Sequence, residues 1–272
     1  MNVFCFYHLQ RYKPIIIVPT FSFNFIRSTA KSFHRSNGKE GSRSVAERFV
    51  VVSRTKPSLA HVQRSVVTYP VANIVTDDAP KLPAILAYHG QAYKHLKAET
   101  LNVDDLNYSQ GRLWITSFLY GLLRPLDAIL PYRMEGNVEL PSGEGQNMFG
   151  FWKSRLTDVL IEAVKADGGT LIHLATEEYQ HLFDWHRVRK EVRVVQPLFY
   201  VRKGSELKIQ AVWAKTCRGA MTRFIIENRI DKPEDLCAFS YEGFTYEPKL
   251  GERLRVGERS SGMPDFPHFI KQ

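Results

Sequence analysis

The sequence predicts a protein of mixed α/β or α+β class, because strand-like apolar runs alternate with helical patterns along most of the chain. The clearest helical pattern covers residues 149–163, where apolar side chains recur every three or four positions. Gly168 and Gly169 follow as a helix stop signal, and the apolar run 171–175 comes next as a strand covered on both faces. A chain of 272 residues, 44% of them hydrophobic, is long enough to bury such elements around a core.

The other expected elements follow from the same two patterns. Asp104 and Asp105 favour a helix start near residue 103, and Pro125 ends that helical pattern. Pro233 stands in the first turn of a further short helix. The expected strands are 15–18, 84–88, 171–175, 192–201 and 207–214, and the expected longer helices are 103–123, 149–163 and 218–229.

The positive charge of the chain is confined to its first quarter. The formal net charge is +9, and residues 1–75 hold eleven Lys or Arg side chains against only two acidic ones, Glu40 and Glu47. Residues 76–272 therefore hold 26 basic and 26 acidic side chains. Bulk charge does not predict nucleic-acid binding for this larger part, where a basic surface can arise only by clustering.

Several function classes are excluded by what the sequence lacks. No apolar run approaches the roughly 18 residues that span a bilayer, so we expect no membrane association. The three cysteines include no C-x-x-C pair, which argues against a disulfide framework or a closed zinc site and favours a reducing compartment. Neither a phosphate-binding loop nor a dinucleotide fingerprint nor an H-E-x-x-H motif is found, and we expect no cofactor and no metal site.

The strongest candidate for chemistry is the strand, loop and helix expected across residues 212–223. Thr216 is a suitable helix N-cap, and the free backbone N–H groups at a helix start attract anions. Lys215 and Arg218 add positive charge beside these groups, so the corner suits a phosphate or a carboxylate. The same cations are structural if they run along the surface and pair with nearby acids. Cys217, between them, is a weaker candidate for a thiol of lowered pKa.

A second candidate is a polar cleft lined by Arg124, Asp127, Arg133 and Glu135. Carboxylates beside arginines serve acid–base chemistry only when their pKa values are tuned, which no sequence pattern shows. A structural network of ion pairs explains the same four side chains.

A third candidate is the pair Glu177 and Glu178, which follows the strand expected to end at residue 175. Residues after the carboxyl end of a strand often face a ligand crevice in α/β sheets. An N-cap at Thr176 with acids in the first helical turn explains the pair without any function. His173 is expected in the core, and iron sequestration by it and the two glutamates is a weaker hypothesis.

Several segments together resemble the YaaA peroxide-stress family. In chain order they are LYGLLRPLD (119–127), PYR (131–133), LATEEY (174–179), AKTCRG (214–219), RFIIENRIDKPEDL (223–236) and SYEGF (240–244). The resemblance covers about residues 76–250 and keeps the order and spacing of these segments. It implies a cytoplasmic bacterial protein with a single α+β domain, in which a mixed sheet is flanked by helices.

The resemblance also implies a function and a set of residues. The expected role is survival of hydrogen peroxide by limiting damage from unincorporated iron. Family members look like double-stranded DNA binders with a positively charged cleft and a helix-hairpin-helix element, and no protein partner is expected. Carried over residue by residue, the expected DNA- or anion-binding residues are Lys215, Arg218, Arg223, Asn228, Arg229, Arg124 and Arg133.

The first quarter departs from the family pattern. Family sequences begin with a strand and an S-P-A-K-T turn. The most similar segment of this sequence, residues 15–20, has no lysine. We therefore divide the chain into a divergent basic segment (1–75), a YaaA-like domain (76–260) and a C-terminal tail (261–272). A genuine replacement, a targeting extension and a reading-frame error in the gene all explain residues 1–75.

Two functions of different classes stay open from the sequence. The first is a non-enzymatic stress protein that binds DNA phosphates through clustered cations. The second is an enzyme acting on a phosphorylated or carboxylated small molecule at a site that combines Lys215, Arg218, Arg124, Glu177 and Glu178. Convergence of these groups on one enclosed pocket would favour the enzyme.

Overall fold

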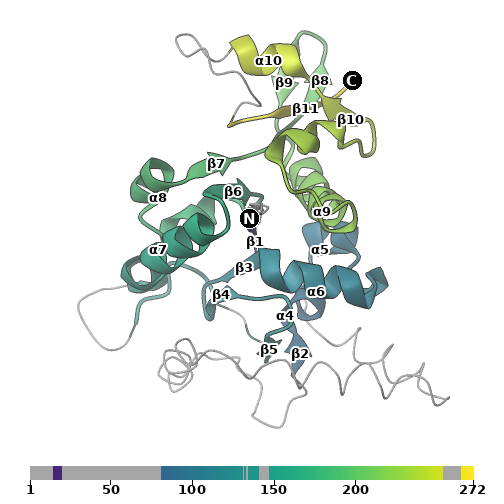
Figure 1. Ribbon diagram of the computed structural model, residues 1–272. Coiled ribbons are helices and arrows are strands. Elements are labelled where there is room, and N and C mark those ends of the chain that lie inside the picture. The colour runs from purple at the N-terminus through teal and green to yellow at the C-terminus, as the bar shows by residue number, and fades with distance from the viewer. Residues whose placement is uncertain (1–14, 20–80, 131, 133, 141–146, 254–264) are drawn as a thin grey trace, which may run out of the picture.

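The strands that the structure describes form three sheets, and helices pack around the largest of them (Figure 1). The computed structural model describes residues 15–19, 81–130, 132, 134–140, 147–253 and 265–272. Parallel and antiparallel pairings both occur, which confirms the expected mixed α/β class with mixed sheets flanked by helices. Within these residues, no helix combines the length and the apolar character that crossing a membrane requires.

The large sheet is built around a strand from the first quarter of the chain. β1 (Ile15–Pro19) lies in the middle of the order β4-β3-β1-β6-β7 and pairs in parallel with β3 (Leu113–Ser117) and β6 (Thr170–His173). Its first four residues are all β-branched, which favours a strand. Ile16 and Ile17 are only 0% and 1% exposed, as a strand covered on both faces requires. The strand expected at 15–18 is therefore confirmed.

The helix expected over residues 103–123 is wrong in its second half. α6 (Val103–Arg112) is capped by Asn102, whose side-chain oxygen accepts a hydrogen bond from the backbone N–H of Asp105 at 2.8 Å. The chain then enters β3, all of whose residues are buried, and returns antiparallel as β4 (Gly121–Leu123). A short apolar run buried on both faces has no period of its own, so its pattern did not separate strand from helix.

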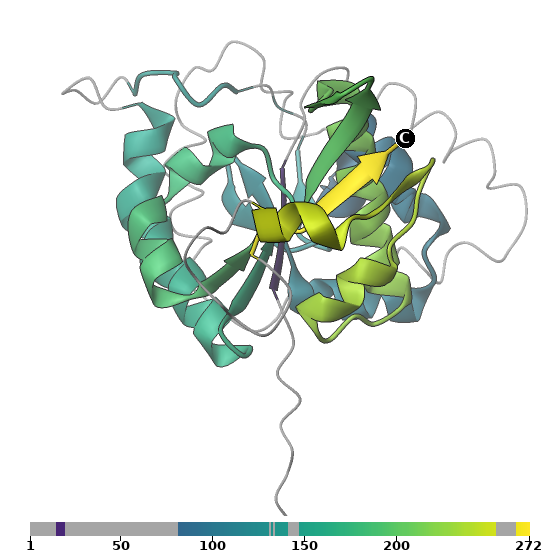
Figure 2. The same ribbon diagram turned by 90° about the horizontal axis from the view of Figure 1, so that it is seen from above.

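Helices cover both faces of the large sheet (Figure 2). α7 (Met148–Ala166) and α8 (Trp185–Glu191) lie on one side, and α5 (Gln91–Leu96), α6 and α9 (Ala211–Glu227) lie on the other. The helix expected at 149–163 and the strand expected at 171–175 are confirmed in place as α7 and β6, with β6 two residues shorter at its end.

A second sheet of four strands lies at the C-terminal end of the chain, in the order β10-β11-β8-β9. Its strands are β8 (Leu198–Lys203), β9 (Glu206–Lys208), β10 (Phe244–Tyr246) and β11 (His268–Lys271). The single strand expected at 192–201 is in fact two strands, because β7 (Arg193–Val195) joins the large sheet and β8 joins the second. Pro197 lies between them and has no N–H to donate to either ladder.

Two of the expected strands are wrong, because helices occupy all or part of their residues. The strand expected at 84–88 is the single helical turn α4 (Ala84–Ala87), which docks through the N–H groups of Ala84 and Ile85 onto the carbonyl oxygens of Asp127 and Pro125. The strand expected at 207–214 stops at Lys208, and α9 begins at Ala211 rather than near residue 218. The remaining short elements are β2 (Leu82–Pro83), η1 (Ala98–Thr100), β5 (Ala128–Ile129), η2 (Glu177–Leu182), η3 (Pro233–Ala238) and α10 (Pro248–Arg253).

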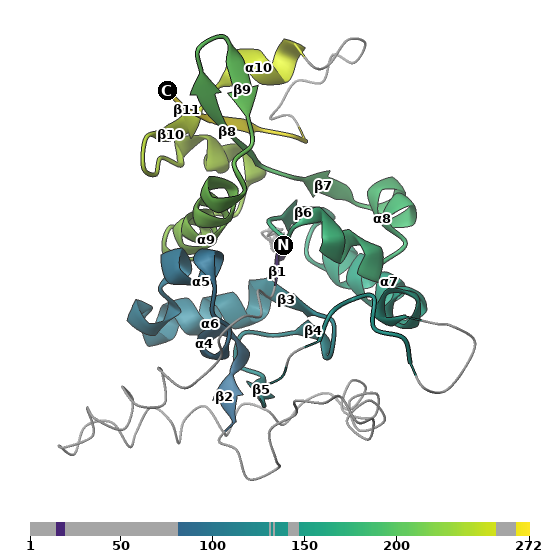
Figure 3. The same cartoon turned by 180° about the vertical axis from the view of Figure 1, so that it is seen from behind.

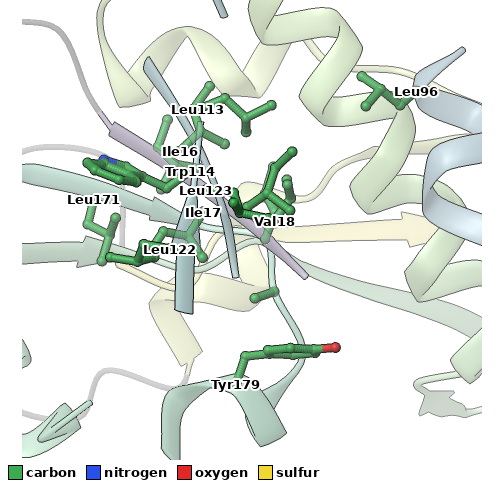
Figure 4. Packing of buried hydrophobic residues seen from close by; sticks show 14 of the residues in the cluster. Ile16, Ile17, Val18, Leu96, Leu113, Trp114, Leu122, Leu123, Leu171 and Tyr179 are labelled. Atoms are coloured by element: carbon green, nitrogen blue, oxygen red, sulfur yellow. The ribbon is translucent and has the colours of Figure 1, made fainter. Parts of the chain in front are cut away.

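The core lies where the strands of the large sheet meet its helices (Figure 4). Side chains from β1, β3, β4 and β6 interleave there, and Trp152 of α7 donates its indole N–H to the carbonyl oxygen of Phe118 at 2.7 Å. On the other face α5 runs beside α9 (Figures 1 and 3). Gly219 allows this approach, because a Cβ at that position would overlap the backbone of Ala92.

Candidate functional site: a pocket at the strand ends

The carboxyl ends of three parallel strands meet at one edge of the large sheet. β1, β3 and β6 run in the same direction, so Val18, Ser117 and His173 lie at that edge. Ligands of open α/β sheets bind at such an edge, outside the ends of the strands. This edge is therefore the first place to look for a site.

A small pocket opens beside the end of β1, between α5 and α9. Its cavity volume is about 10 Å³, room for about one water molecule, and it is lined by Val18, Ala92, Tyr93, Leu96, Arg218, Gly219 and Thr222. We call it the Arg218 pocket. Its walls are almost entirely apolar, although Arg218, Tyr93 and Thr222 among the lining residues carry polar groups.

The Arg218 guanidinium is half-buried and lacks a counter-ion among the residues that the structure describes. Burial lowers its pKa, and within the described residues no hydrogen bond or ion pair to a carboxylate involves it. A cation that is moved partly out of water costs free energy unless an opposite charge offsets that cost. No carboxylate among the described residues offsets this cost for Arg218.

His173 lies at the end of β6 and close to Arg218. The side chain is buried, and burial together with the positive charges of Arg218 and Arg189 lowers its pKa to about 3. The imidazole is therefore neutral at physiological pH, and its ring packs against Trp185 with 4.8 Å between centroids. Its Nδ1 atom is buried and has no hydrogen-bond partner in the described structure.

Tyr93 supplies a second buried polar atom without a partner. Only 7% of Tyr93 is exposed, and its hydroxyl makes no hydrogen bond to any described residue. Burial raises its pKa well above the usual value, so the hydroxyl keeps its proton and can donate it. Next to it, the Tyr88 hydroxyl is bonded to that of Tyr132 at 2.8 Å, and Tyr132 is bonded in turn to Ser117. Tyr93 is thus the unsatisfied member of a group of buried hydroxyls.

The Arg218 pocket therefore has one charged lining residue, Arg218. His173 is not among the lining residues, and the Tyr93 hydroxyl is buried beside the pocket. No carboxylate is found among the described residues that line the pocket.

The expectation that Lys215 and Arg218 flank a helix start is wrong. α9 begins at Ala211, so both lie inside the helix, where backbone N–H groups are used by the helix itself. Thr216 is not the N-cap, because its hydroxyl is buried and accepts a hydrogen bond from the Gln91 side chain at 2.8 Å. Lys215 is half-buried and has an interaction partner. The early residues of α9 are apolar and fit a strand equally well, which explains the wrong boundary.

Cys217 is not a reactive thiol in this structure. It is completely buried, and burial raises its pKa to about 12. The thiol therefore stays protonated, and a protonated buried thiol is a poor nucleophile.

The Arg223 side chain links α9 to the C-terminal end of α5. Its guanidinium donates hydrogen bonds to the carbonyl oxygens of Leu96 and Lys97 at 3.0 and 2.9 Å, where α5 ends, and to the Thr100 hydroxyl at 2.7 Å. It also forms an ion pair with Glu227 at 2.7 Å. These contacts satisfy the free carbonyl groups at the end of α5.

Arg229 and Asn228 close the C-terminal end of α9. Asn228 donates from its side chain to the carbonyl oxygen of Phe224 at 2.8 Å. The Arg229 guanidinium pairs with Asp105 of α6 at 2.7 Å and lies 4.7 Å from the ring centre of Tyr108. Both residues therefore have structural partners at the far end of α9 from Lys215.

Arg124 and Asp127 lie at the opposite edge of the large sheet from the Arg218 pocket. Arg124 follows β4, and its guanidinium lies 3.5 Å from the ring centre of Trp114, near the start of β3. The length of β3 separates the two edges by roughly 13 Å at about 3.3 Å per residue. Burial lowers the pKa of Arg124 to about 10 and raises that of Asp127, which accepts a hydrogen bond from the Arg124 backbone N–H at 2.7 Å. This pair does not reach the pocket.

The other expected carboxylates do not enter the pocket either. Glu177 and Glu178 are exposed in the first turn of η2, and Glu135 is exposed and has a partner of its own. Arg133 lies outside the described residues. Within the described part of the chain, no group of three or more His, Cys, Asp or Glu residues is arranged to hold a metal ion.

Two buried residues with unpaired polar atoms in the described structure were not expected as such from the sequence. His173 was placed correctly in the core, but its unpaired nitrogen and its nearness to Arg218 follow only from the fold. Its position at a strand end was the one available signal. Tyr93 lies in a short helix without any motif, and nothing in its sequence surroundings marks it.

The fold defines an α/β protein with a small pocket beside Arg218 at the strand ends of its largest described sheet. The chain belongs to the family of the peroxide stress protein YaaA, whose family model matches residues 39–250. The match ends where the resemblance was expected to end, but it begins well before residue 76. β1, although central to the sheet, lies outside the matched range.

Curated bacterial relatives agree with this assignment. A UPF0246 protein of Bacteroides thetaiotaomicron is 47% identical over 180 residues, which cover 66% of this chain and 70% of the relative. A UPF0246 protein of Phocaeicola vulgatus is 51% identical over 172 residues, 63% of this chain and 68% of the relative. One of Porphyromonas gingivalis is 47% identical over 177 residues, 65% and 69% of the two chains.

Proposed function

We propose that this protein acts in resistance to hydrogen peroxide by binding the phosphates of double-stranded DNA, and that it thereby limits iron-linked damage. Membership of the peroxide stress family supports the physiological role. The single observation that carries the binding proposal is the half-buried Arg218 guanidinium, which has no counter-ion among the described residues. A phosphate oxygen offsets the cost of burying that charge.

The proposed binding is largely independent of DNA sequence. Contacts to phosphates position a protein on DNA but carry no direct sequence information. Each neutralised phosphate releases counter-ions, so affinity falls with salt by about 0.9 in log–log slope per contact. Lys215, one turn from Arg218 on α9, is the expected second phosphate ligand.

The test is duplex affinity across a salt series for the wild type and for the double variant Lys215→Ala/Arg218→Ala. We expect the variant to bind at least tenfold more weakly and its salt slope to fall by about 2, in proportion to the two lost contacts. The matched control is Lys153→Ala/Lys190→Ala, which removes the same charge from exposed positions of α7 and α8. Equal affinity and slope for wild type and Lys215→Ala/Arg218→Ala would contradict DNA binding at this place.

The physiological part has its own test. Cells that lack the gene are complemented with the wild type or the double variant and exposed to hydrogen peroxide, with and without a cell-permeant iron chelator. We expect the variant to fail in protection, and the chelator to remove the difference. Full protection by the variant would separate peroxide resistance from DNA binding at Arg218.

The alternative of an enzyme that uses Arg124, Glu177 and Glu178 together with Lys215 and Arg218 is less well supported. Such an enzyme needs these groups to converge on one pocket. Arg124 lies at the other edge of the sheet and both glutamates are exposed.

A further inference from the structure

We infer that two copies of this chain associate through β9, whose free edge pairs antiparallel with the same edge of a second copy across a twofold axis at Leu207. β9 (Glu206–Lys208) is an end strand of the second sheet, and among the described strands only β8 pairs with it. Such an edge presents backbone N–H and C=O groups to which a further strand can bind. The inference goes beyond the proposed function and does not depend on it.

β9 lacks a feature that the other free edges of the two larger sheets share. The other end strands are β4, β7 and β10, and each is followed by a proline two positions beyond its last residue, at Pro125, Pro197 and Pro248. Proline cannot donate a backbone hydrogen bond, and natural sheets use it to block unwanted strand pairing at their edges. β9 is followed instead by Ile209 and Gln210. Its edge is therefore open at the end where the other three carry a proline.

The register of the β8–β9 hairpin, which projects at one end of the molecule (Figures 1 and 3), fixes which backbone groups of β9 face outwards. Lys203 pairs with Glu206 across a two-residue loop, and Arg202 pairs with Leu207. In an antiparallel ladder the closing pair of such a hairpin exchanges both of its hydrogen bonds, and the next pair exchanges none. The N–H and C=O of Leu207 therefore point away from β8, towards the free edge. They are the donor and the acceptor that β9 offers to a second copy.

The charges of β9 select one register for this pairing. Outward-facing residues of the two copies must pair with each other, so the twofold axis lies at Glu206, Leu207 or Lys208. An axis at Glu206 or at Lys208 puts two like charges directly opposite each other, which is unfavourable. With the axis at Leu207, Glu206 lies opposite the partner's Lys208, and Lys208 lies opposite the partner's Glu206. In this register the strand is complementary in charge to itself.

Glu206 and Lys208 are accessible for these contacts. Their side chains are 64% and 60% exposed, and they form an ion pair with each other at 2.6 Å between Oε2 and Nζ. The ion pair shows that both extend from the same face of β9, as alternate residues of a strand do. An ion pair this exposed contributes little to stability, so exchanging it for two pairs between copies costs little.

Exposed apolar side chains adjoin the same edge. Five large apolar side chains are clearly exposed among the described residues, and two of them, Ile209 at 53% and Val212 at 63%, follow β9 within four residues. Continuing the pairing by one residue at each end places Ile209 diagonally beside the partner's Leu207, within contact distance. The pairing therefore covers apolar surface that a single copy leaves in water.

The experiment is sedimentation equilibrium of the full chain, without nucleic acid. Because two short strands bury less surface than a standard interface, we expect a weak dimer with a Kd of about 10–100 µM. The protein is measured from tenfold below to tenfold above this range. A wild type that stays monomeric throughout would overturn the inference and leave the edge to a strand from another protein.

Leu207→Pro tests the backbone pairing, because it removes the outward N–H without removing a hydrogen bond to β8. The matched control is Leu207→Val, which keeps the N–H. We expect the proline variant to self-associate at least about tenfold more weakly, since two hydrogen bonds are lost by symmetry, and the valine variant to behave as the wild type. Chemical denaturation confirms that both variants are folded. Equal self-association of the two would show that the dimer uses another surface.

Charge exchange tests the register without altering the backbone. Glu206→Lys and Lys208→Glu each put like charges opposite each other in their own dimers, so we expect each alone to self-associate about tenfold more weakly. An equal mixture of the two restores opposite charges at both positions and should form a heterodimer as tight as the wild-type dimer. The double variant Glu206→Lys/Lys208→Glu should also dimerise as the wild type does.

The matched controls for charge exchange are Lys153→Glu and Glu162→Lys, which change the same charges at exposed positions of α7. We expect both to dimerise as the wild type does, alone and mixed. If the mixture of β9 variants forms no heterodimer, the twofold register at Leu207 is wrong. None of these outcomes bears on DNA binding at Arg218, which the salt series on Lys215→Ala/Arg218→Ala tests separately.

Discussion

Gly219 of α9 lies directly against the backbone of Ala92 in α5, so closely that a Cβ on Gly219 would overlap the Ala92 carbonyl oxygen. This contact brings Arg218 and Tyr93, the neighbours of the two residues in sequence, to the same pocket. Helices approach this closely only through residues without a side chain.

Gly219→Ala should therefore be clearly destabilising. The overlapping atom belongs to backbone rather than to a flexible side chain, so two helices must shift, at a cost of about 1–3 kcal/mol in the free energy of unfolding. The matched control is Gly111→Ala in α6, where an added Cβ meets no atom within 4 Å. That control should be neutral or up to about 1 kcal/mol more stable, because alanine favours helix. Urea denaturation of both variants measures the difference, and equal midpoints would contradict it.

Arg223→Ala should lower stability more than it lowers DNA affinity. The substitution removes the hydrogen bonds that satisfy the end of α5, worth about 2 kcal/mol for bonds from a charged donor. Arg223→Lys should recover only part of this loss, because an ammonium group lacks the planar fork. Denaturation and duplex binding, measured on the same folded samples, compare the two effects. A variant of unchanged stability and strongly reduced affinity would instead assign Arg223 to the DNA surface.

His173 should make stability depend on pH. Its pKa is about 3 in the folded protein and near 6.5 in the unfolded chain. Between these two pH values the unfolded chain therefore binds a proton at His173 and the folded protein does not. This stabilising difference is fully present above pH 6.5 and is lost as the pH falls towards 3, by about 1.4 kcal/mol per pH unit. His173→Gln should flatten the dependence between pH 6 and pH 4 by about one proton. Unfolding free energies at several pH values test this, and unchanged slopes would show that His173 protonates freely.

Arg124→Met should be tolerated, whereas Arg124→Ala should not. The guanidinium packs on Trp114 while burial lowers its pKa to about 10, so the side chain supplies contact area at the cost of a desolvated charge. Methionine keeps most of that packing and removes the charge, and we expect stability within about 1 kcal/mol of the wild type or above it. Alanine leaves the Trp114 face uncovered and should cost about 1–2 kcal/mol more. Similar losses in both variants would indicate that the charge itself is needed.

The elements that sequence patterns located correctly are those with strong local signals. α7 has a helical apolar stripe and a Gly168-Gly169 stop, and β1 is a run of β-branched residues between prolines. The errors fall where burial on both faces removes the period. The pattern of β3 resembles a continuation of α6 for this reason, and the apolar first turn of α9 resembles a strand.

The candidate site was predictable only in part. Arg218 was chosen for its charge and its motif, but the expected surroundings, a helix start with free N–H groups, are wrong. Arg223 and Arg229 have the same charge and prove to be engaged by α5 and α6. Whether a cation is paired depends on contacts between segments far apart in the chain, and one sequence does not show those contacts.

The central position of β1 has a consequence for how the chain is made. Ile16 is synthesised well before its two partners in the ladder, Leu113 and Ile172. The middle of the sheet therefore cannot close until translation has passed β6, and until then an aliphatic segment stays without its neighbours. Between the synthesis of β1 and that of β6, this segment is therefore open to aggregation.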